Sequence, residues 1–510
     1  MSDDLTPIIV GAGQFTEKDV DPAEALGPME LMVEAAERAT EDAGIGKDKL
    51  ARLDMLVAVR SAIDAVEIDG ISNDIRNPPE ALAMRIGAHK AKQYLAPTGG
   101  NTPQTLVNYT AEQIAQGRVR FALLCGAEAL DTLSKAIMTG LKRDWRIPSS
   151  KDPELIAPER EGTSRVEEAY GLELPIYNYP LFENALRGHY GHTIEAHQQK
   201  IARLFSRFTD IAAQNPYAWF PVRRSPEEIA TPSAVNRYIS FPYTKLMTAI
   251  MKVNQSAALL MTSAGFAREL DIDESRWIYL HGCADTHDHW YITERENYYS
   301  SPAIAMAGEK TLQMAGMTID DMDYFDFYSC FPSVVEIARD MLGIAEDDPR
   351  DLTVTGGLPY HGGPGSNYVM HSVATMVDKL RRNPGTKGLV TANGWYVTKH
   401  SFGIYSSDPP TGAWYREDPA VYQAQIDARS RPEVVHTPSG SGTVETYTVV
   451  FGRDGEPEKG IVIGRLKNGR RFLANTPKDK ALLENMTTAD PLGLSGTVRQ
   501  QGGLSIFSPR

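Results

Sequence analysis

The chain has 510 residues and a net charge of −14, and 42% of its residues are hydrophobic and 23% charged. This length exceeds one ordinary core and predicts two to four domains of a globular protein, and the negative charge disfavours non-specific binding to nucleic acid or to an anionic membrane. No apolar run approaches the length of a membrane span, and the first residues lack the pattern of a secretory signal. The three cysteines have no metal-ligand or disulfide spacing, so we expect a reducing, cytoplasmic location.

The first part of the chain alternates short apolar strands with helices. Residues 7–14 predict a buried strand that runs into a glycine turn, and residues 29–43 have helical spacing with Gly44 as a plausible cap. A second buried strand follows at 53–59, then a helix at 101–117 and a strand at 121–125. This β-α-β-α order favours an α/β fold with a covered sheet.

The same order of elements recurs after a long insertion. The predicted elements are strands at 256–262 and 278–280, a helix at 303–314, a strand at 324–328, helices at 333–342 and 369–380, and a strand at 388–392. Two similar α/β halves are the simplest architecture for this pattern.

The insertion, at about residues 131–240, is rich in proline, tyrosine and arginine. It is too long for a structureless connection, so it must carry local structure, and residues 183–215 predict two helices that are split near Gly191.

The sequence pattern changes after about residue 410. Short alternating segments at 443–451, 460–465, 471–474 and 496–507 are separated by turn residues, which predicts a small β-barrel in a separate domain.

A glycine-dense loop precedes the predicted helix at 369–380, because residues 356–367 read GGLPYHGGPGSN. Such a loop lets the backbone approach a ligand closely, and the helix after it presents free N–H groups. The loop resembles the last glycine loop of the thiolase superfamily, which reads Gly-Gly, four residues, then Gly-His-Pro. In that family the histidine activates a nucleophilic cysteine, and here its position holds Gly363.

Other segments resemble the same superfamily, in particular its sterol-carrier-protein-x type and the thiolase-like proteins of type 1 with an extra C-terminal domain. In chain order they are IAQG at 114–117, LCGAE at 124–128, GHYGH at 188–192, NPYA at 215–218, NQSAALLM at 254–261 and YSCF at 328–331. Their order and spacing extend the resemblance from Pro7 to about Tyr405.

The resemblance implies a duplicated five-layered α-β-α-β-α thiolase fold with an inserted loop domain that holds coenzyme A, plus a C-terminal small β-barrel similar to an OB fold. The implied segments are 1–130 and 241–262 for the N-terminal half, 131–240 for the loop domain, 263–410 for the C-terminal half and 411–510 for the barrel. The loop-domain residues that would bind coenzyme A phosphates are Arg187, Arg203, Arg207 and Arg223.

The catalytic positions that the family uses are replaced in this chain. Counting back from Gly117 places the nucleophilic cysteine of the family at Gly100. The second cysteine, which transfers protons, falls at Asn393, and the side chain of the oxyanion hole falls at Tyr328. Together with Gly363, these replacements predict that conventional thiolysis is weak or absent.

Two histidines and an amide remain near these positions. His361 is either a substitute base that reaches the same pocket or a hydrogen-bonded loop histidine, and His400 has the same alternatives. Asn393 or Tyr328 would polarise a thioester carbonyl, although Asn393 is also followed by glycine, as in many turns.

Cys330 is either a relocated nucleophile or a small buried side chain beside Phe331. The backbone N–H groups of residues 101–103 and of the Gly363 loop would bind a carbonyl oxygen or a phosphate. The predicted substrate-binding residues here are Gly100, Asn101, Thr102, Phe331 and Gly363. A cluster of His, Asp and Cys residues at 281–289 invites a zinc site, but its spacing favours a polar strand end.

Two functions therefore stay open. The first is an acyltransferase-class enzyme, similar to an acetyl-CoA acetyltransferase, that acts on an acyl-CoA. The second is a non-catalytic acyl-CoA-binding protein or a partner subunit of a mixed thiolase-type complex. Both predict a small-molecule ligand with coenzyme A as substrate or ligand, no other cofactor, and no nucleic acid or membrane partner, and the core strands suggest a homodimer.

Overall fold

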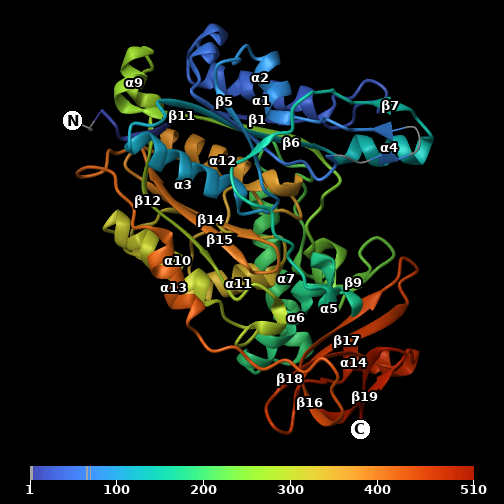
Figure 1. The fold of residues 1–510 in the computed structure, drawn as a ribbon. Helices are drawn as coiled ribbons and strands as arrows, with labels where there is room; N and C mark the ends of the chain where they lie inside the picture. The colour runs from blue at the N-terminus through green and yellow to red at the C-terminus, as the bar shows by residue number, and fades with distance from the viewer. Residues whose placement is uncertain (1–3, 65–66, 69–70) are drawn as a thin grey trace.

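The computed structural model describes residues 4–64, 67–68 and 71–510 (Figure 1). The first half of the chain contributes five long strands to the main sheet: β1 (Pro7–Thr16), β2 (Met55–Val59), β5 (Lys92–Ala96), β6 (Phe121–Ala129) and β11 (Asn254–Ser263). They lie in the order β5-β2-β6-β11-β1, and the short strand β8 (Glu154–Leu155) extends the edge at β5. A separate small sheet contains β3 (Glu67–Ile68), β4 (Ile71–Ser72) and β7 (Arg143–Asp144).

The second half repeats this arrangement with four strands: β12 (Ile278–His287), β13 (Tyr324–Asp326), β14 (Lys387–Gly394) and β15 (Lys399–Ser406). In each half a parallel pair, β2 with β6 or β13 with β14, is followed by two antiparallel partners. The two half-sheets join where β1 pairs with β12, at Ile8↔Tyr279 and Ile9↔Ile278. The predicted duplication is confirmed.

Helices cover both half-sheets and fill the space between them. Their bounds are α1 (Pro28–Asp42), α2 (Pro78–Arg85), α3 (Thr102–Ala115), α9 (Ala264–Glu269), α10 (Pro302–Ala315), α11 (Pro332–Met341) and α12 (Tyr368–Arg382). Figure 1 shows α3 and α12 in the middle layer, with α1 and α2 outside one half-sheet and α10 and α11 outside the other. Successive side chains of β6 point to opposite faces of the sheet and so pack in two different hydrophobic cores. Leu123 packs in the outer cluster, and Leu124 packs in the inner one. The five-layered thiolase fold is therefore confirmed.

One strand is longer than the sequence suggested. The prediction ended at residue 280, but β12 continues to His287. Its polar residues stay in the strand because their backbones pair with β15, as Thr286↔His400 does. Two side chains of a neighbouring helix also accept from the strand: the Tyr422 Oη accepts from the Asp285 N–H, and the Gln423 Oε1 accepts from the His287 N–H.

The insertion carries helices α4 (Leu130–Thr139), α5 (Arg165–Ala169), α6 (Pro175–Tyr190), α7 (Ile194–Ala212) and α8 (Pro226–Ala230), and strands β9 (Tyr238–Ser240) and β10 (Tyr243–Thr244). The predicted split is confirmed, because α6 and α7 are separated at Gly191, where φ is +70°. The first of these helices begins earlier than predicted and contains Pro180, a residue that more often marks a helix start.

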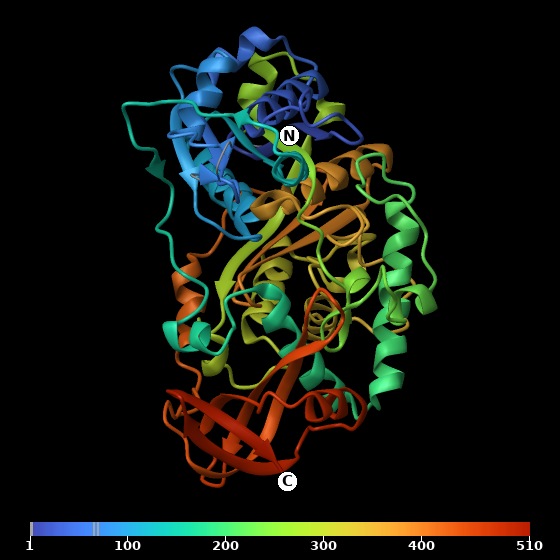
Figure 2. The same cartoon turned by 90° about the vertical axis from the view of Figure 1, so that its right-hand side faces the viewer.

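The C-terminal strands form a closed barrel: β16 (Gly440–Phe451), β17 (Pro457–Leu466), β18 (Arg471–Asn475), β19 (Ser495–Gln501) and β20 (Leu504–Pro509). Closure follows because β16 pairs with both β17 and β19, and α14 (Lys480–Thr488) packs on β17. Figure 2 shows the barrel at the opposite end of the molecule from the N-terminal half.

The barrel is attached to the insertion through the sheet itself. Residue Ser240 of β9 pairs with Val450 of β16, and α6 packs against β16. Within the predicted segment 411–510, α13 (Pro419–Asp427) instead packs on β12 and α10 of the second half. Among the described residues, no helix combines the length and the apolar character that crossing a bilayer requires.

Candidate functional site

The turn at Gly99 and Gly100 lies directly before α3, in the middle layer between the two half-sheets. Two further predicted positions meet it there. Tyr328 follows β13, and Asn393 lies near the end of β14. The fold therefore brings together three positions that lie up to 293 residues apart in the sequence.

The hydroxyl group of Tyr328 fills the space that a side chain at position 100 would need. A Cβ atom placed on Gly100 would lie 2.1 Å from the Tyr328 Oη and 2.5 Å from the main-chain oxygen of Asn393. Real Cβ atoms essentially never approach other heavy atoms below 3.0 Å. Glycine is thus the residue that this backbone accepts at the predicted nucleophile position.

Asn393 belongs to a short chain of hydrogen bonds. Its Nδ2 donates to the Tyr179 Oη at 2.6 Å, and that hydroxyl donates to the main-chain oxygen of Trp395 at 2.6 Å. The Tyr179 ring stacks on Phe331 at 4.5 Å. The Asn393 Oδ1 is buried and accepts no hydrogen bond from any described residue, which is uncommon and leaves one acceptor free for a ligand.

Cys330 lies next to this chain but is poorly suited to be a nucleophile. Its side chain is 7% exposed, and burial raises the pKa of the thiol to about 12, which Tyr179 only partly offsets. The thiolate, not the thiol, is the reactive form. The arrangement therefore supports the interpretation of a buried structural cysteine.

His361 lies one aromatic ring away from the site. Its ring contacts Tyr368 with centroids 5.8 Å apart, and Tyr368 contacts Tyr328 at the same separation. The ring also faces His371 at 5.1 Å, and its Nδ1 lies 3.3 Å from the Gly362 oxygen. Complete burial lowers the pKa of His361 to about 4, so the ring is neutral at pH 7. Its role as a base stays a prediction.

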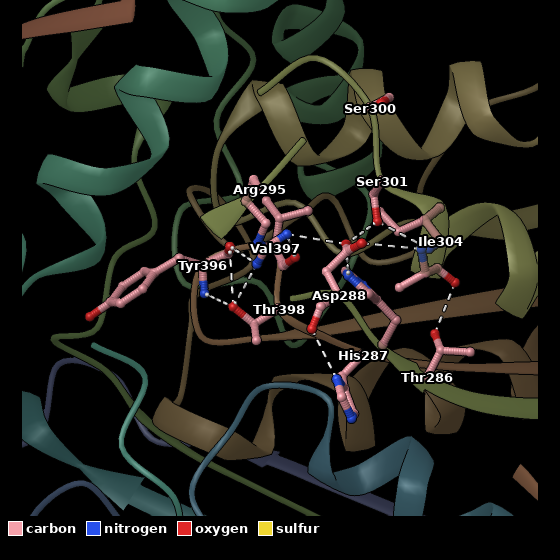
Figure 3. Close-up of polar contacts among 12 residues, drawn as sticks. Thr286, His287, Asp288, Arg295, Ser300, Ser301, Ile304, Tyr396, Val397 and Thr398 are labelled. Carbon is pink, nitrogen blue, oxygen red and sulfur yellow. Dashed lines mark hydrogen bonds and ion pairs between the residues drawn. The ribbon is translucent and has the colours of Figure 1, made fainter. Parts of the chain in front are cut away.

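His400 is directed to an acidic cluster in the second half. Its Nε2 lies 3.7 Å from the Asp288 Oδ2, and Asp288 also lies 3.2 Å from Arg295 and accepts from the Ser301 hydroxyl at 2.5 Å. Figure 3 shows Asp288 between Arg295 and Ser301. Burial raises the pKa of Asp288, but Arg295 and His400 outweigh it, so the pKa lies below its usual value and the carboxylate is ionised.

Two of the predicted backbone donors already have partners, which contradicts part of the expected oxyanion site. The Thr102 N–H donates to the Gly99 oxygen at 3.0 Å, and the Gly363 N–H donates to the Ile250 oxygen at 2.8 Å. The Asn101 Nδ2 donates to Thr105. The helix and loop backbones thus already pair these donors within the protein, and the donors are not free for a ligand.

Position 363 differs from position 100 in its space. A Cβ on Gly363 would meet the end of the Leu358 side chain at 3.3 Å and the Ile250 oxygen at 3.5 Å, so a small side chain fits with little movement.

Sequence reasoning missed Lys399, which follows the hairpin between β14 and β15. Its Nζ donates to the Thr98 oxygen at 2.7 Å and lies 5.6 Å from the centre of the Trp395 ring. Burial lowers the pKa of the amine to about 8, with a partial opposing effect from Glu159. The position of Lys399 opposite Gly394 in the hairpin indicates that it lies near the site. A lysine ordinarily titrates far above neutrality, however, so the sequence favours the adjacent histidine as the base.

The predicted phosphate-binding arginines have different surroundings. Arg187 is 2% exposed and forms a bidentate contact with Asp490 of the barrel, at 2.8 and 2.6 Å. Arg223 is exposed and pairs with Asp210 at 3.4 Å. Arg203 lines a cavity of about 200 Å³ on α7. The other residues around this cavity are Lys200, Leu204, Arg207, Glu336, Arg339 and Glu346.

Among the described residues, one group has the composition of a metal site: Glu183, His197 and Glu336, all buried. These groups already have partners within the protein, because Lys200 lies 2.8 Å from Glu336 and a ring nitrogen of His197 lies within hydrogen-bonding distance of Glu183, at 2.5 Å. The candidate zinc residues at 281–289 do not converge in this way.

Comparisons with known proteins agree with the fold. A family model described as the thiolase-like protein type 1 additional C-terminal domain matches residues 422–503. The structure of a monomeric SCP2-thiolase-like protein type 1 from Mycobacterium smegmatis is 37% identical, with a TM-score of 0.86 and 100% of each chain covered.

More distant proteins resemble this chain in structure or in sequence. The Ltp2–ChsH2(DUF35) aldolase is 19% identical with a TM-score of 0.57, covering 79% of this chain and 98% of that one. An acetyl-CoA acetyltransferase from Methanocaldococcus jannaschii is 23% identical over 348 residues, which is 66% of this chain and 77% of the relative.

Proposed function

Because this chain belongs to the SCP2-thiolase-like protein type 1 family, we propose that it binds an acyl-CoA thioester and does not perform the two-step thiolysis of ordinary thiolases. The observation that carries the second part is the Tyr328 hydroxyl in the space of a side chain at Gly100. A covalent acyl-enzyme by that route needs a thiol at this position.

The cysteines elsewhere in the chain do not replace it. Cys125, Cys283 and Cys330 are all buried, and burial raises the pKa of each thiol. At a pKa of about 12, roughly one thiol in 10⁵ is ionised at pH 7. Thiolysis through any of them is therefore expected to be very slow.

Acyl-CoA binding is supported by the cavity on α7. Its lining holds four cationic side chains, from Lys200, Arg203, Arg207 and Arg339, against the two glutamates 336 and 346, and clusters with an excess of cations bind phosphate groups well. Arg203 is the most informative of these, because Lys200 pairs with Glu336 and Arg207 with Asp351. The sequence similarity to an acetyl-CoA acetyltransferase, at 23% identity over 348 residues, supports the same ligand class.

The alternative is a protein that binds without catalysis or serves as a partner subunit. The barrel is the feature that favours it, because it is an addition to the two thiolase halves. Its attachment is extensive, through β9 and the Arg187–Asp490 pair, so its free faces would be the docking surface. The Mycobacterium smegmatis relative is monomeric, which weakens the expectation of a homodimer through the core.

Calorimetry and a turnover assay test the proposal together. We expect coenzyme A and acetyl-CoA to bind, and Arg203→Ala to weaken binding about 10- to 150-fold, since one charge-assisted hydrogen bond is worth roughly 1.5–3 kcal/mol. Arg453→Ala, which removes an exposed arginine of the C-terminal barrel, is the matched control and should bind as the wild type does. Absence of binding by either ligand, or thiolysis of acetoacetyl-CoA at ordinary thiolase rates, would overturn it.

A further inference from the structure

A lysine amine lies beside the turn where the family carries its nucleophile. The Lys399 Nζ donates to the Thr98 oxygen at 2.7 Å. A Cβ placed on Gly99 would lie 2.6 Å from this Nζ, so the amine occupies the space that a side chain at position 99 would need. Position 99 is adjacent to the predicted nucleophile position, and Lys399 is only partly exposed.

No carboxylate of a described residue lies within 4.0 Å of the Lys399 amine. Glu159, the acid whose charge acts on it, is engaged elsewhere, because its carboxylate accepts from the Thr98 N–H at 2.9 Å and lies 3.9 Å from Arg60. Burial therefore lowers the pKa of the amine to about 8, which leaves a substantial neutral fraction near physiological pH. A desolvated lysine of this kind is the usual form of a nucleophilic amine.

Polar atoms without partners gather around the same turn. The Asn101 Oδ1, the Asn393 Oδ1 and the Trp395 Nε1 are buried and form no hydrogen bond with any described residue. A Cβ on Gly394 would lie 2.2 Å from the Asn101 Oδ1 and 2.9 Å from the Lys399 Cε, so the amide and the lysine stem flank one glycine. Native proteins rarely leave such groups unpaired, and a polar ligand at the turn would pair them.

We propose that Lys399 forms an imine with the 3-oxo carbon of a 3-oxoacyl thioester bound at this turn. The inference rests on the proposed binding of acyl thioesters and adds the substrate class and the reacting atom. The neutral Nζ adds to the ketone carbon to give a carbinolamine. That intermediate then loses water, which carries away the ketone oxygen, and no oxidant or reductant takes part.

The protonated imine draws electrons from carbon 2 of the substrate, so a proton at carbon 2 leaves more readily and an enamine forms. Hydrolysis of the imine returns the free amine. Attack on the thioester carbon is the competing reaction, and it would expel the thiol and leave a stable amide that blocks Lys399 after one event. Reversibility therefore favours the ketone as the target.

Reductive trapping tests the inference on the full-length protein. The protein is incubated with acetoacetyl-CoA and cyanoborohydride, and in parallel with the acetoacetyl thioester of N-acetylcysteamine, which lacks the nucleotide. Peptide mass mapping should find on Lys399 the mass of the whole thioester less one oxygen atom, as expected for a reduced imine, with at least tenfold less label in Lys399→Arg. Lys379→Arg is the matched control, because the Lys379 Nζ also lies over an aromatic ring, at 4.7 Å from the centre of Tyr324.

The outcomes separate this inference from the proposed function. If the small thioester labels Lys399 but calorimetry shows no binding of acetoacetyl-CoA, the proposal of a reactive lysine holds and the proposal of an acyl-CoA ligand fails. Binding of acetoacetyl-CoA with no reduced adduct from either thioester overturns the imine. So does label spread evenly over the lysines, or an acyl group alone on Lys399, which is the mass of the amide. Equal thermal midpoints of Lys399→Arg and the wild type exclude unfolding as the cause.

Discussion

Replacing Gly100 by alanine tests the steric argument on which the proposed loss of thiolysis depends. The added methyl group would lie 2.1 Å from the Tyr328 Oη, 2.6 Å from its Cζ and 2.5 Å from the Asn393 oxygen. Overpacking in a close-packed interior costs about 1–3 kcal/mol, and we expect the upper end because one of the obstructing atoms belongs to the main chain. Thermal and urea unfolding midpoints measure the loss, which at about 3 kcal/mol lowers the thermal midpoint of a chain of 510 residues by roughly 3 °C.

A double-mutant cycle assigns this cost to its source. Tyr328→Ala removes the ring that obstructs position 100, so Gly100→Ala should cost about 1–2 kcal/mol less in that background. The relief is partial because the Asn393 oxygen stays in place. Gly363→Ala is the matched glycine control and should change the free energy of unfolding by less than about 0.5 kcal/mol, since its nearest neighbour is a flexible side-chain end at 3.3 Å.

The result that would refute the reasoning is a Gly100→Ala protein as stable as the wild type. Position 100 would then accept a side chain, and the missing nucleophile would have no steric explanation. A Gly363→Ala protein as unstable as Gly100→Ala would equally show that the clash does not set the cost.

Three further variants test the buried polar groups. His361→Asn should reduce the acid sensitivity of the fold, measured as urea midpoints at each pH. Burial lowers the pKa of His361 to about 4, so the neutral ring does not affect stability above pH 6.5, but the free energy of unfolding falls by up to about 3 kcal/mol as the pH falls from 6.5 through 4. Asp288→Asn should lower the free energy of unfolding by about 3 kcal/mol, because it leaves the buried Arg295 cation without its carboxylate at 3.2 Å. Arg471→Met should destabilise the contact between the barrel and the rest of the chain, because Arg471 is fully buried, binds Glu445 at 2.6 Å and donates to the Thr293 oxygen at 3.0 Å. Limited proteolysis should then release the C-terminal domain faster.

Each of these has an exposed counterpart as its control. His436→Asn, Asp144→Asn and Arg453→Met change the same residue types at the surface and should alter stability by less than about 0.5 kcal/mol. An acid profile of His361→Asn that follows the wild type would contradict the pKa argument. Equal losses for Asp288→Asn and Asp144→Asn, or unchanged proteolysis in Arg471→Met, would contradict the assigned role of the buried ion pairs.

The sequence by itself determined the architecture. The repeated order of apolar strands and helices gave two α/β halves, and the turn-separated segments after residue 440 gave the barrel. The glycine loop around Gly363 and the count back to Gly100 located the positions where the superfamily keeps its catalytic groups. These features are local, because strand alternation, helical spacing and turn residues are written in neighbouring positions.

The tertiary structure decided what the site contains. It placed the Tyr328 hydroxyl against Gly100, and it directed Arg187 to Asp490, a residue 303 positions away. It also placed the half-buried Lys399 beside Thr98, with no carboxylate partner among the described residues, which makes an ordinary lysine a candidate nucleophile. Desolvation and the distances between charges depend on which distant segments pack around a group, and for that reason the pattern of neighbouring residues does not reveal them.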